Sequence, residues 1–440
     1  MVRALSVLAA TLVLIFNAAC SAAPAGPSAD PIQLLLFGDP EELAAYRTLL
    51  DAYHTQSGGS RVELIEASDR ADLIARLSTS IAGGKPPDVF LINYRYYGQF
   101  AAKNAIAPLD RRLGTGTGQL DADALYPEAR EAFRWQGKQL CLPQNVSSLV
   151  VYYNRALFKK FGVPEPKPGW TWTDLITTAQ AMTRDARGVP IKAGETDAAS
   201  PVATWGLGVE PTLIRIAPFV WSAGGEIVDD PDTPSRLAFD NPVARETLRQ
   251  FLDLRGAYGV VPTDQQVEAQ DDESRFTNGG LAMLLSSRRL TTTLRAVDNL
   301  DWDVAPLPVH KEPAGILHSD AYCITSASGR QDAAWEFVRF ALGPDGQRVL
   351  ARTGRTVPSN IEVSRSAEFL DPTKPPRNAQ VFLDAIGTIR HTPTISTWPE
   401  IEDVTNGILE NGLYRGDRLD DVIAALDEQT RPLFARAESS

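Results

Sequence analysis

The sequence is poor in the residues that carry most catalytic chemistry. Its 440 residues include only four histidines and three cysteines, and these are scattered along the chain. It contains no G-x-S-x-G, H-E-x-x-H, Walker or dinucleotide-binding motif, and the run Gly114–Gly118 lacks the spacing and the preceding strand of a phosphate loop. A glycosidase carboxylate pair could still lie among the 55 acidic residues, because its geometry leaves no sequence signature. We therefore predict a protein that is not an enzyme and that uses no cofactor and no metal ion.

Features of nucleic-acid binding and of membrane spanning are also scarce. The formal net charge is −12, and no basic run is interleaved with aromatic residues, so nucleic acid is not an expected partner. Beyond the amino terminus, no segment approaches the ~20 consecutive apolar residues of a transmembrane helix. The composition, 43% hydrophobic and 22% charged, is that of an ordinary globular protein.

The amino terminus has the pattern of an export signal. Arg3 precedes the apolar run Leu5–Phe16, which is too short to span a bilayer and is typical of a secretory signal. Small residues then lead to Cys20, as in bacterial lipoprotein signals, so we expect a signal peptide at residues 1–20 and lipidation of Cys20. Residues 21–30 are rich in Ala, Pro, Ser and Gly and suit a flexible tether. The alternative is a secreted form cleaved near Ala23.

Strand and helix patterns alternate after the tether. The roughly 410 residues that follow suggest two or more lobes, at ~100–200 residues per domain. The apolar run Ile32–Phe37 predicts a strand that is covered on both faces of its sheet. Asp39 and Pro40 then open a helix. This alternation indicates an α/β protein with mostly parallel sheets, in which ligands bind beyond the carboxyl ends of the strands. Further strands are expected at Val62–Ile65 and Pro87–Ile92, with a helix between them at Asp72–Ile81.

Several motifs in register give a resemblance to a known family. Gly137, Pro143, Tyr153, Asn154, Trp172 and Leu175 match a G…P…YN…W-T-x-L pattern, and Thr171 with Asp174 forms a capping box before that last helix. Later matches are Gly224-Gly225, Phe276–Met283, Trp302–Pro308 and Gly354–Pro358. The chain thus resembles the extracellular solute-binding proteins of family 1, the maltose-binding-protein-like substrate-binding lipoproteins of carbohydrate ABC transporters.

The resemblance implies a two-lobed α/β fold of the periplasmic-binding-protein kind (type II-like), with a hinge between discontinuous lobes. The chain crosses between the lobes three times, and we expect crossings near Gln144–Ser148, Leu300–Asp303 and Asp320–Ile324. Lobe I is then residues 31–145 and 303–320, and lobe II is residues 146–302 and 321–440.

Two cysteines remain if Cys20 is lipidated. Cys141 and Cys323 lie in apolar strand-like segments, and in an exported protein they either pair or stay as small buried hydrophobic residues. The crossings that the resemblance implies place both beside the hinge, so a bridge between them would restrain hinge motion.

A sugar site needs carboxylates or amides for hydroxyls and aromatic rings for the apolar faces. The loops after the predicted strands and the family positions give the candidate ligand-binding residues, which are Asp39, Glu41, Asn93, Tyr94, Arg95, Tyr96, Asn145, Ser147, Trp221, Arg288, Arg289, Ser319, Asp320, Trp398 and Glu400. Helix capping is the alternative role of Asp39 and Glu41. The tyrosines could instead pack in an ordinary surface loop, and the tryptophans could be buried core residues. Asp320 is the strongest carboxylate candidate, and Trp398 is the best candidate for stacking on a sugar.

These observations predict the extracytoplasmic substrate-binding component of an ABC importer for a mono- or oligosaccharide or a derivative. Its expected partners are a carbohydrate, the transmembrane permease subunits and, through the lipid anchor, the outer face of the cell membrane; we expect a monomer. Arg95, Arg288 and Arg289 also fit a glycerophosphodiester or a sugar phosphate. A secreted carbohydrate-active hydrolase and a ligand-sensing partner of a membrane receptor are further alternatives.

Overall fold

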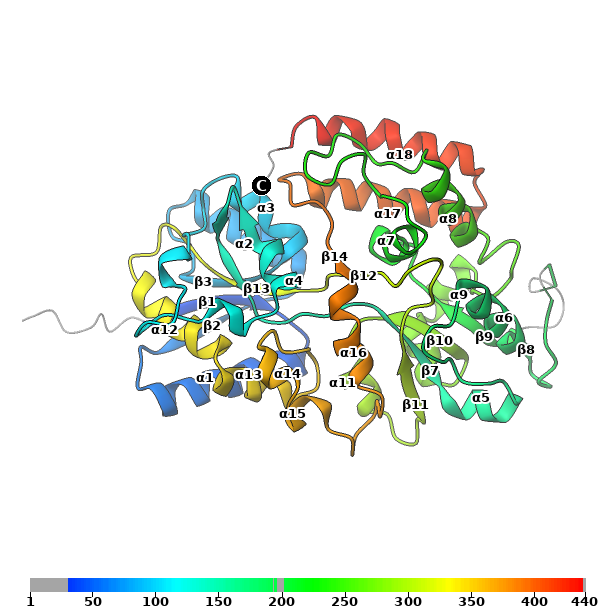
Figure 1. Cartoon of the computed structure of the whole chain (residues 1–440), viewed down its shortest axis with the longest axis horizontal. Coiled ribbons are helices and arrows are strands. Elements are labelled where there is room, and N and C mark those ends of the chain that lie inside the picture. Colours follow the sequence, from blue (N-terminus) through cyan, green and yellow to red (C-terminus); the bar gives the residue numbers. More distant parts are fainter. Residues whose placement is uncertain (1–30, 193, 196–201, 438–440) are drawn as a thin grey trace, which may run out of the picture.

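The chain forms two lobes, each built around one five-stranded sheet. A computed structural model describes residues 31–192, 194–195 and 202–437, and Figure 1 shows the lobes side by side. The predicted signal peptide, Cys20 and the tether lie outside the described residues. Within the described part, no helix combines the length and the apolar character needed to cross a bilayer.

The first sheet has the strand order β2-β1-β3-β13-β6. Its strands are β1 (Ile32–Phe37), β2 (Val62–Ala67), β3 (Val89–Asn93), β6 (Cys141–Pro143) and β13 (Asp320–Ile324). β1 runs parallel to β2 and β3, whereas β13 is antiparallel to both β3 and β6. The sheet is therefore mixed, and the expectation of a mostly parallel sheet holds only for the amino-terminal β-α-β segment.

Helices pack around this sheet and continue the lobe far along the chain. Asp39 caps the first helix by accepting a hydrogen bond from the Glu42 amide at 2.9 Å, as its sequence predicts. This helix packs against two helices that follow β13, so the chain from β13 to about residue 370 belongs to the first lobe. The helices are α1 (Pro40–Ser57), α2 (Arg70–Ala82), α3 (Tyr94–Ala101), α4 (Pro127–Arg130), α12 (Gln331–Leu342), α13 (Pro344–Ala351), α14 (Ile361–Ser364) and α15 (Ala367–Leu370).

The second sheet has the order β11-β7-β10-β9-β8. Its strands are β7 (Val150–Asn154), β8 (Arg184–Asp185), β9 (Val202–Gly208), β10 (Leu281–Ser286) and β11 (Trp302–Ala305). The capping box of Thr171 and Asp174 is formed at the start of α6. The helices of this part are α5 (Arg155–Phe161), α6 (Trp172–Met182), α7 (Leu213–Ser222), α8 (Pro242–Leu252), α9 (Asp264–Ala269), α10 (Asp272–Thr277), α11 (Leu290–Arg295), α16 (Gln380–Asp384), α17 (Trp398–Arg415) and α18 (Leu419–Phe434).

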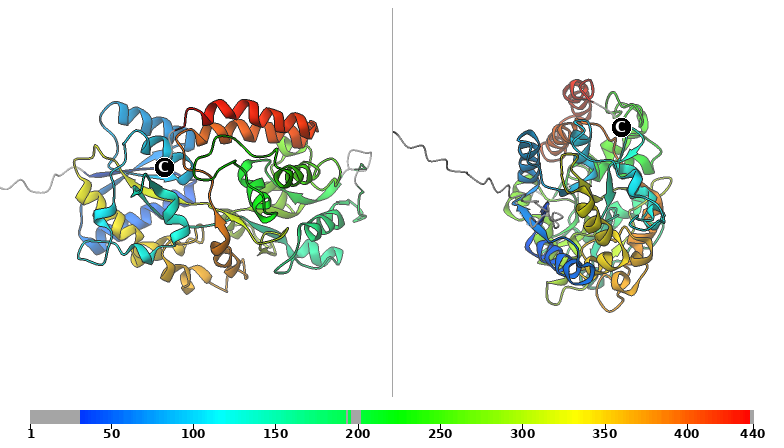
Figure 2. Two further views of the ribbon diagram at one scale, coloured as in Figure 1. Left: turned by 45° about the horizontal axis from the view of Figure 1, so that its top comes forward. Right: turned by 90° about the vertical axis from the view of Figure 1, so that its left-hand side faces the viewer.

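Short strands and turns complete the fold. β4 (Arg134–Trp135) pairs with β5 (Lys138–Gln139), and β12 (Gly315–Ile316) pairs with β14 (Ile389–Arg390). The short 3-10 helices are Asp110–Arg112, Ala122–Ala124, Glu131–Phe133 and Ile386–Thr388. Figure 2 shows α17 and α18 lying together along one side of the second lobe.

The strand pairing corrects two of the three predicted crossings. The first lies between Pro143 and Val150, a stretch that contains the predicted Gln144–Ser148. The second runs from the end of β11 to the start of β13, because β11 pairs with β7 in the second sheet. The predicted third crossing, Asp320–Ile324, is instead β13 within the first sheet. The chain returns to the second lobe after α15, and α17 packs there against α7 and α8.

The lobe assignments change accordingly. The segment that begins at residue 321 belongs to the first lobe through α15, and β11 belongs to the second. A sequence-based boundary fails here because β13 finds its partners more than 170 residues away, in β3 and β6.

Cys141 and Cys323 form a disulfide, with their Cα atoms 4.5 Å apart. They are register partners in the antiparallel pair β6 and β13. Both strands belong to the first sheet, so the bridge spans no crossing. The premise that Cys323 lies in a crossing is wrong. The bridge fastens one edge of the first lobe, and we expect it to leave hinge motion unrestrained.

Candidate functional site

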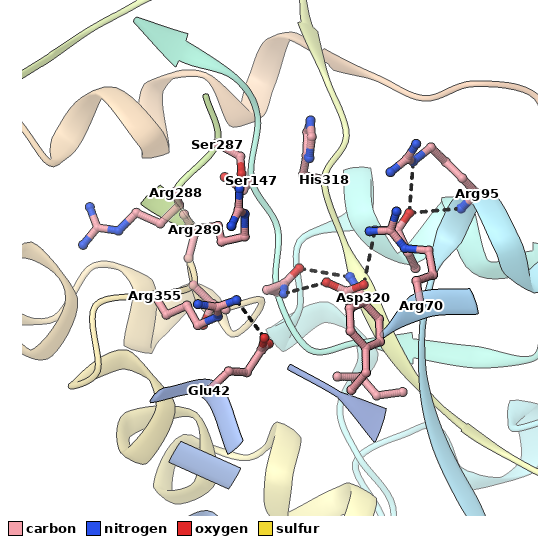
Figure 3. A pocket seen from close by; sticks show the side chains of 16 residues that line it. Glu42, Arg70, Arg95, Ser147, Ser287, Arg288, Arg289, His318, Asp320 and Arg355 are labelled. Carbon is pink, nitrogen blue, oxygen red and sulfur yellow. Dashed lines mark hydrogen bonds and ion pairs between the residues drawn. The ribbon is translucent and has the colours of Figure 1, made fainter. Parts of the chain in front are cut away.

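A cavity of about 170 Å³ lies between the two lobes at the crossings. Half of its lining residues come from β1, the end of β3, the starts of α1 and β13, and the segment after α13. The first two crossings add side chains, and the turn after β10 closes it from the second lobe (Figure 3). The lining residues are Phe37, Glu42, Arg70, Leu91, Asn93, Arg95, Asn145, Ser147, Ser287, Arg288, Arg289, His318, Asp320, Arg355, Thr356 and Val357.

The two crossings at the cavity are hydrogen-bonded to each other. Ser147 and His318 exchange backbone hydrogen bonds of 3.0 and 2.8 Å between amide and carbonyl. Each crossing therefore fixes the position of the other, and the side chains on them face the cavity from a shared two-stranded segment.

Asp320 is held in the cavity by two amide side chains. Asn93 donates to Oδ1 of Asp320 at 3.2 Å, and Asn145 donates to Oδ2 at 3.4 Å. The backbone amide of Asp320 in turn donates to Oδ1 of Asn145 at 3.0 Å. Asn93 and Asp320 are register partners on β3 and β13, so the sheet itself aligns them. The result is a carboxylate of fixed orientation with neighbouring amides, which can accept from and donate to hydroxyl groups.

A second carboxylate enters the cavity from the start of α1. Arg355 forms an ion pair with Glu42 at 2.8 Å and another with Asp39. Burial raises the pKa of Glu42 to about 7, against the opposing effect of Arg355. Glu41, the predicted ligand contact, is exposed to solvent. The helix turns by about 100° per residue, and this places Glu42 rather than Glu41 at the cavity.

The segment Asn93–Tyr97 is a helix start rather than a loop. Asn93 caps α3 by accepting from the Arg95 amide at 3.3 Å, and only Asn93 and Arg95 of the predicted group line the cavity. Tyr94 packs in the interior, and its hydroxyl lies 3.4 Å from that of Thr392. Tyr96 lies beneath the Arg70 guanidinium, 5.0 Å from the ring centre.

The two tryptophans predicted to stack on ligand are core residues. Trp398 is fully buried, and its Nε1 donates to Glu402 Oε2 at 3.2 Å. Glu402 also forms a buried ion pair with Arg95, so the start of α17 is bound to α3. Trp221 is 3% exposed in the core of the second lobe. Neither ring lines the cavity.

Of three further candidate ligand contacts, one lines the cavity and two do not. Ser319 is buried, and its hydroxyl donates to the Asn145 carbonyl at 2.6 Å, so it supports the crossing rather than lining the cavity. Glu400 lies on the surface, where it pairs with Arg436 at 2.7 Å. Ser147 lines the cavity.

The neighbouring arginines after β10 are placed very differently. Arg288 is fully buried with its guanidinium 4.6 and 4.7 Å from the ring centres of Phe369 and Phe382. Burial lowers its pKa to about 9, and Figure 3 shows its guanidinium directed away from Asp320. Arg289 is half exposed and pairs with Glu273 at 2.7 Å. Arg288 is thus mainly a packing residue, and Arg289 is the better placed of the two for a solute.

Sequence reasoning did not select several cavity residues. Arg70, in the first turn of α2, and Arg355, after α13, carry no local signal for ligand binding. The Gly354–Pro358 motif marked the segment of Arg355, but not the side chain. His318 was also not selected, although it immediately precedes Ser319 and Asp320. Burial and the charge of Arg215 lower the pKa of His318. In the described residues no cluster of side chains suited to a metal ion occurs.

Comparison with known proteins identifies the class. A model of the bacterial extracellular solute-binding proteins matches residues 48–376, and the chain belongs to this family. The diacetylchitobiose-binding protein DasA of Streptomyces coelicolor is 24% identical over 352 residues, 76% of this chain and 73% of DasA.

Solved structures agree with this assignment at the level of the fold. The ABC substrate-binding protein Lmo0181 of Listeria monocytogenes, in complex with cycloalternan, has a TM-score of 0.79 at 22% identity, covering 92% of this chain and 98% of that one. UgpB of Mycobacterium tuberculosis, in complex with glycerophosphocholine, has a TM-score of 0.77 at 19% identity, covering 92% and 99%. The predicted two-lobed α/β fold and the predicted family are both confirmed.

Proposed function

We propose that this solute-binding protein is the extracytoplasmic substrate-binding component of an ABC importer for a carbohydrate. The solute is a mono- or oligosaccharide or a derivative, and it binds in the cavity between the lobes before delivery to the permease. The protein acts as a monomer and performs no covalent chemistry.

The amide-held carboxylate of Asp320 carries this proposal. Sugar hydroxyls both donate and accept, and Asp320 accepts while Asn93 and Asn145 can do both. Carboxylate and amides come from β13, β3 and the first crossing, so a solute bound to them touches the junction of the lobes. DasA is a diacetylchitobiose-binding protein and Lmo0181 was solved with cycloalternan, which supports a saccharide as the solute.

Binding drives closure because the solute contacts both lobes only when they are together. Ser287 and Arg289 contribute from the second lobe, whereas Asp320 and Glu42 contribute from the first. A solute shifts a two-state equilibrium only by its differential affinity for the two states. Contacts from both lobes provide that difference, and hinge closure is the motion it selects. The closed form is the one that the permease recognises.

A lipid on Cys20 holds the protein at the outer face of the membrane. Cys20 follows an apolar run and small residues typical of a lipoprotein signal. Cys20→Ala is expected to release the protein into the culture supernatant or the periplasm, as measured by fractionation. Continued membrane association of this variant would contradict the anchor.

Calorimetric titration of the mature protein tests the function. The solutes are monosaccharides, disaccharides, amino sugars and glycerophosphodiesters. Saturable one-to-one binding of a sugar is the expected result, and absence of binding across the panel would contradict the proposal. Chromatography of an oligosaccharide incubated with the protein provides the second readout, because released product would support the hydrolase alternative.

The anionic alternative also has support. Five of the described residues that line the cavity are arginines, against two carboxylates, and UgpB of M. tuberculosis was solved with glycerophosphocholine. A solute that is both a polyol and an anion satisfies the carboxylates and the arginines together.

A further inference from the structure

Buried polar groups without partners lie at the start of α7 and on the second crossing. Arg215, in the first turn of α7, is 7% exposed, and its Nε and Nη1 have no hydrogen-bond partner. Nε2 of His318 and the hydroxyl of Thr212, which precedes α7, are also buried without a partner. Arg215 uses only Nη2, in an ion pair of 2.9 Å with Glu210, a largely exposed carboxylate.

These groups belong to adjoining elements. α7 packs against β12, and β12 ends two residues before His318. His318 lines the cavity together with Arg95 and Arg289. Burial, and after it the charges of Arg215, Arg95, Arg70 and Arg289, lower the pKa of His318, so these guanidiniums lie within electrostatic reach of its ring.

Leaving such donors unsatisfied is costly. A buried donor without a partner keeps the full cost of losing its contacts with water, and this cost is larger when the group is charged. Thr212 adds to this, since it makes no side-chain hydrogen bond to cap α7. An anion is the acceptor that best removes the cost, because charge-assisted hydrogen bonds to a guanidinium are short and strong and its fork matches two oxygens.

Two parts of the cavity therefore differ in the kind of group they can bind. On the first-lobe side, Glu42 and Asp320 offer acceptors for hydroxyl groups. His318 lines another part of the cavity, apart from Glu42 in Figure 3; its Nε2, and Nε and Nη1 of Arg215, are buried without a partner. A neutral sugar would satisfy the first side and leave the positive charge of Arg215 without a matching anion.

We propose that the solute carries an anionic oxygen group, a phosphate or a carboxylate, which binds between Arg215 and His318 while its hydroxyl groups bind Asp320 and the amides. This inference rests on the proposed function and adds the chemical class of the solute. Arg215 is the residue that sets the preference for the anion.

Matched pairs of solutes test the inference by calorimetry on the mature protein. The pairs are glucose with glucose 1-phosphate, glucose with glucuronate, and glycerol with glycerol 3-phosphate or a glycerophosphodiester. The anionic member of at least one pair is expected to bind tenfold or more tightly than the neutral member. The phosphate and carboxylate arms show which anion is used. Binding of the anion should weaken steeply with added salt, whereas binding of a neutral sugar should not.

Substitution of Arg215 tests whether this residue sets the preference for the anionic solute. Arg215→Gln is expected to lower affinity for the anionic solute tenfold or more and to leave the neutral partner within about twofold. Arg249→Gln is the matched control, since Arg249 forms exposed ion pairs on α8 of the same lobe and should change neither. Circular dichroism verifies folding, and if Arg215→Gln does not fold, the salt dependence of the wild type decides the question.

The outcomes separate the two proposals. Equal binding of neutral and anionic members, or an equal loss of both in Arg215→Gln, overturns the anion site and leaves the importer proposal intact. Failure of every pair to bind, while a sugar of the wider panel binds, overturns the anion site alone, and absence of binding across the whole panel contradicts both.

Discussion

The disulfide between Cys141 and Cys323 is expected to contribute strongly to stability and not at all to solute affinity. The two residues are 182 positions apart, so the bridge closes a very long loop of the unfolded chain. Loop-closure entropy for this length corresponds to about 5 kcal/mol at 25 °C. Both side chains are buried within one sheet, so their bridge constrains the first lobe without spanning a crossing.

Urea unfolding measures the effect. The oxidised wild type is compared with the wild type unfolded and refolded in dithiothreitol, because these two samples differ only in the bridge. The double variant C141A/C323A serves as the control for packing, since it differs from the reduced wild type only by two buried sulfur atoms. We expect reduction to lower the free energy of unfolding by about 5 kcal/mol and to increase the slope m, as the unbridged chain exposes more surface when unfolded.

Two results would refute this reasoning. A loss of less than about 1 kcal/mol would mean that the unfolded chain is not restrained as loop-closure entropy requires. A change in solute affinity of more than about threefold in the folded, reduced protein, measured by calorimetry, would mean that the bridge does influence the relation between the lobes.

Four further predictions concern the site and its surroundings. Asp320→Ala should weaken solute binding at least tenfold, about 1.4 kcal/mol, and unchanged affinity by calorimetry would discard this cavity as the binding site. Trp398→Ala should act on stability instead, at a cost of about 3–5 kcal/mol in urea unfolding; a folded, equally stable variant that has lost affinity would restore the stacking role. Because burial raises the pKa of Glu42 from 4.5 to about 7, the folded state holds this proton more tightly than the unfolded state. Stability should therefore fall as pH rises from about 4.5 to 7, by no more than about 3 kcal/mol, and Glu42→Gln should flatten this dependence in unfolding curves measured across that range. Arg95→Met should cost about 3–5 kcal/mol by leaving the Glu402 carboxylate buried and unpaired, and adding Glu402→Met should recover much of the loss; equal stability of the two variants would show that the pair is not desolvated as described.

Local sequence patterns determined local structure. Asp39 and Pro40 specified the start of α1, and Thr171 with Asp174 specified the start of α6, because a cap involves residues three positions apart. The apolar run Ile32–Phe37 likewise specified a buried strand. Motifs in register gave the family, and with it the two-lobed fold, before any contact was known.

The choice of partner strands was decided only by the tertiary structure. β13 was assigned to the wrong lobe because nothing in Asp320–Ile324 states that it pairs with β3 and β6. The pairing of Cys141 with Cys323 was likewise decided by tertiary structure. The sequence left the disulfide as one of two possibilities, and the register of β6 and β13 brings the two cysteines together.

The site shows the same division between what is local and what is not. Asn93 was selected because it follows a predicted strand, and Asn145 and Asp320 because they lie at predicted crossings; the fold brought them within hydrogen-bonding distance. Trp398 was misplaced because an amphipathic helix start looks the same whether its aromatic residue faces a cavity or the core. Arg215 was missed altogether, since an arginine in a helix becomes a candidate for binding only when its neighbours in space bury it and leave its donors without acceptors. Sequence by itself therefore determined the elements and the family of this protein, whereas the packing of distant segments decided which side chains face the solute.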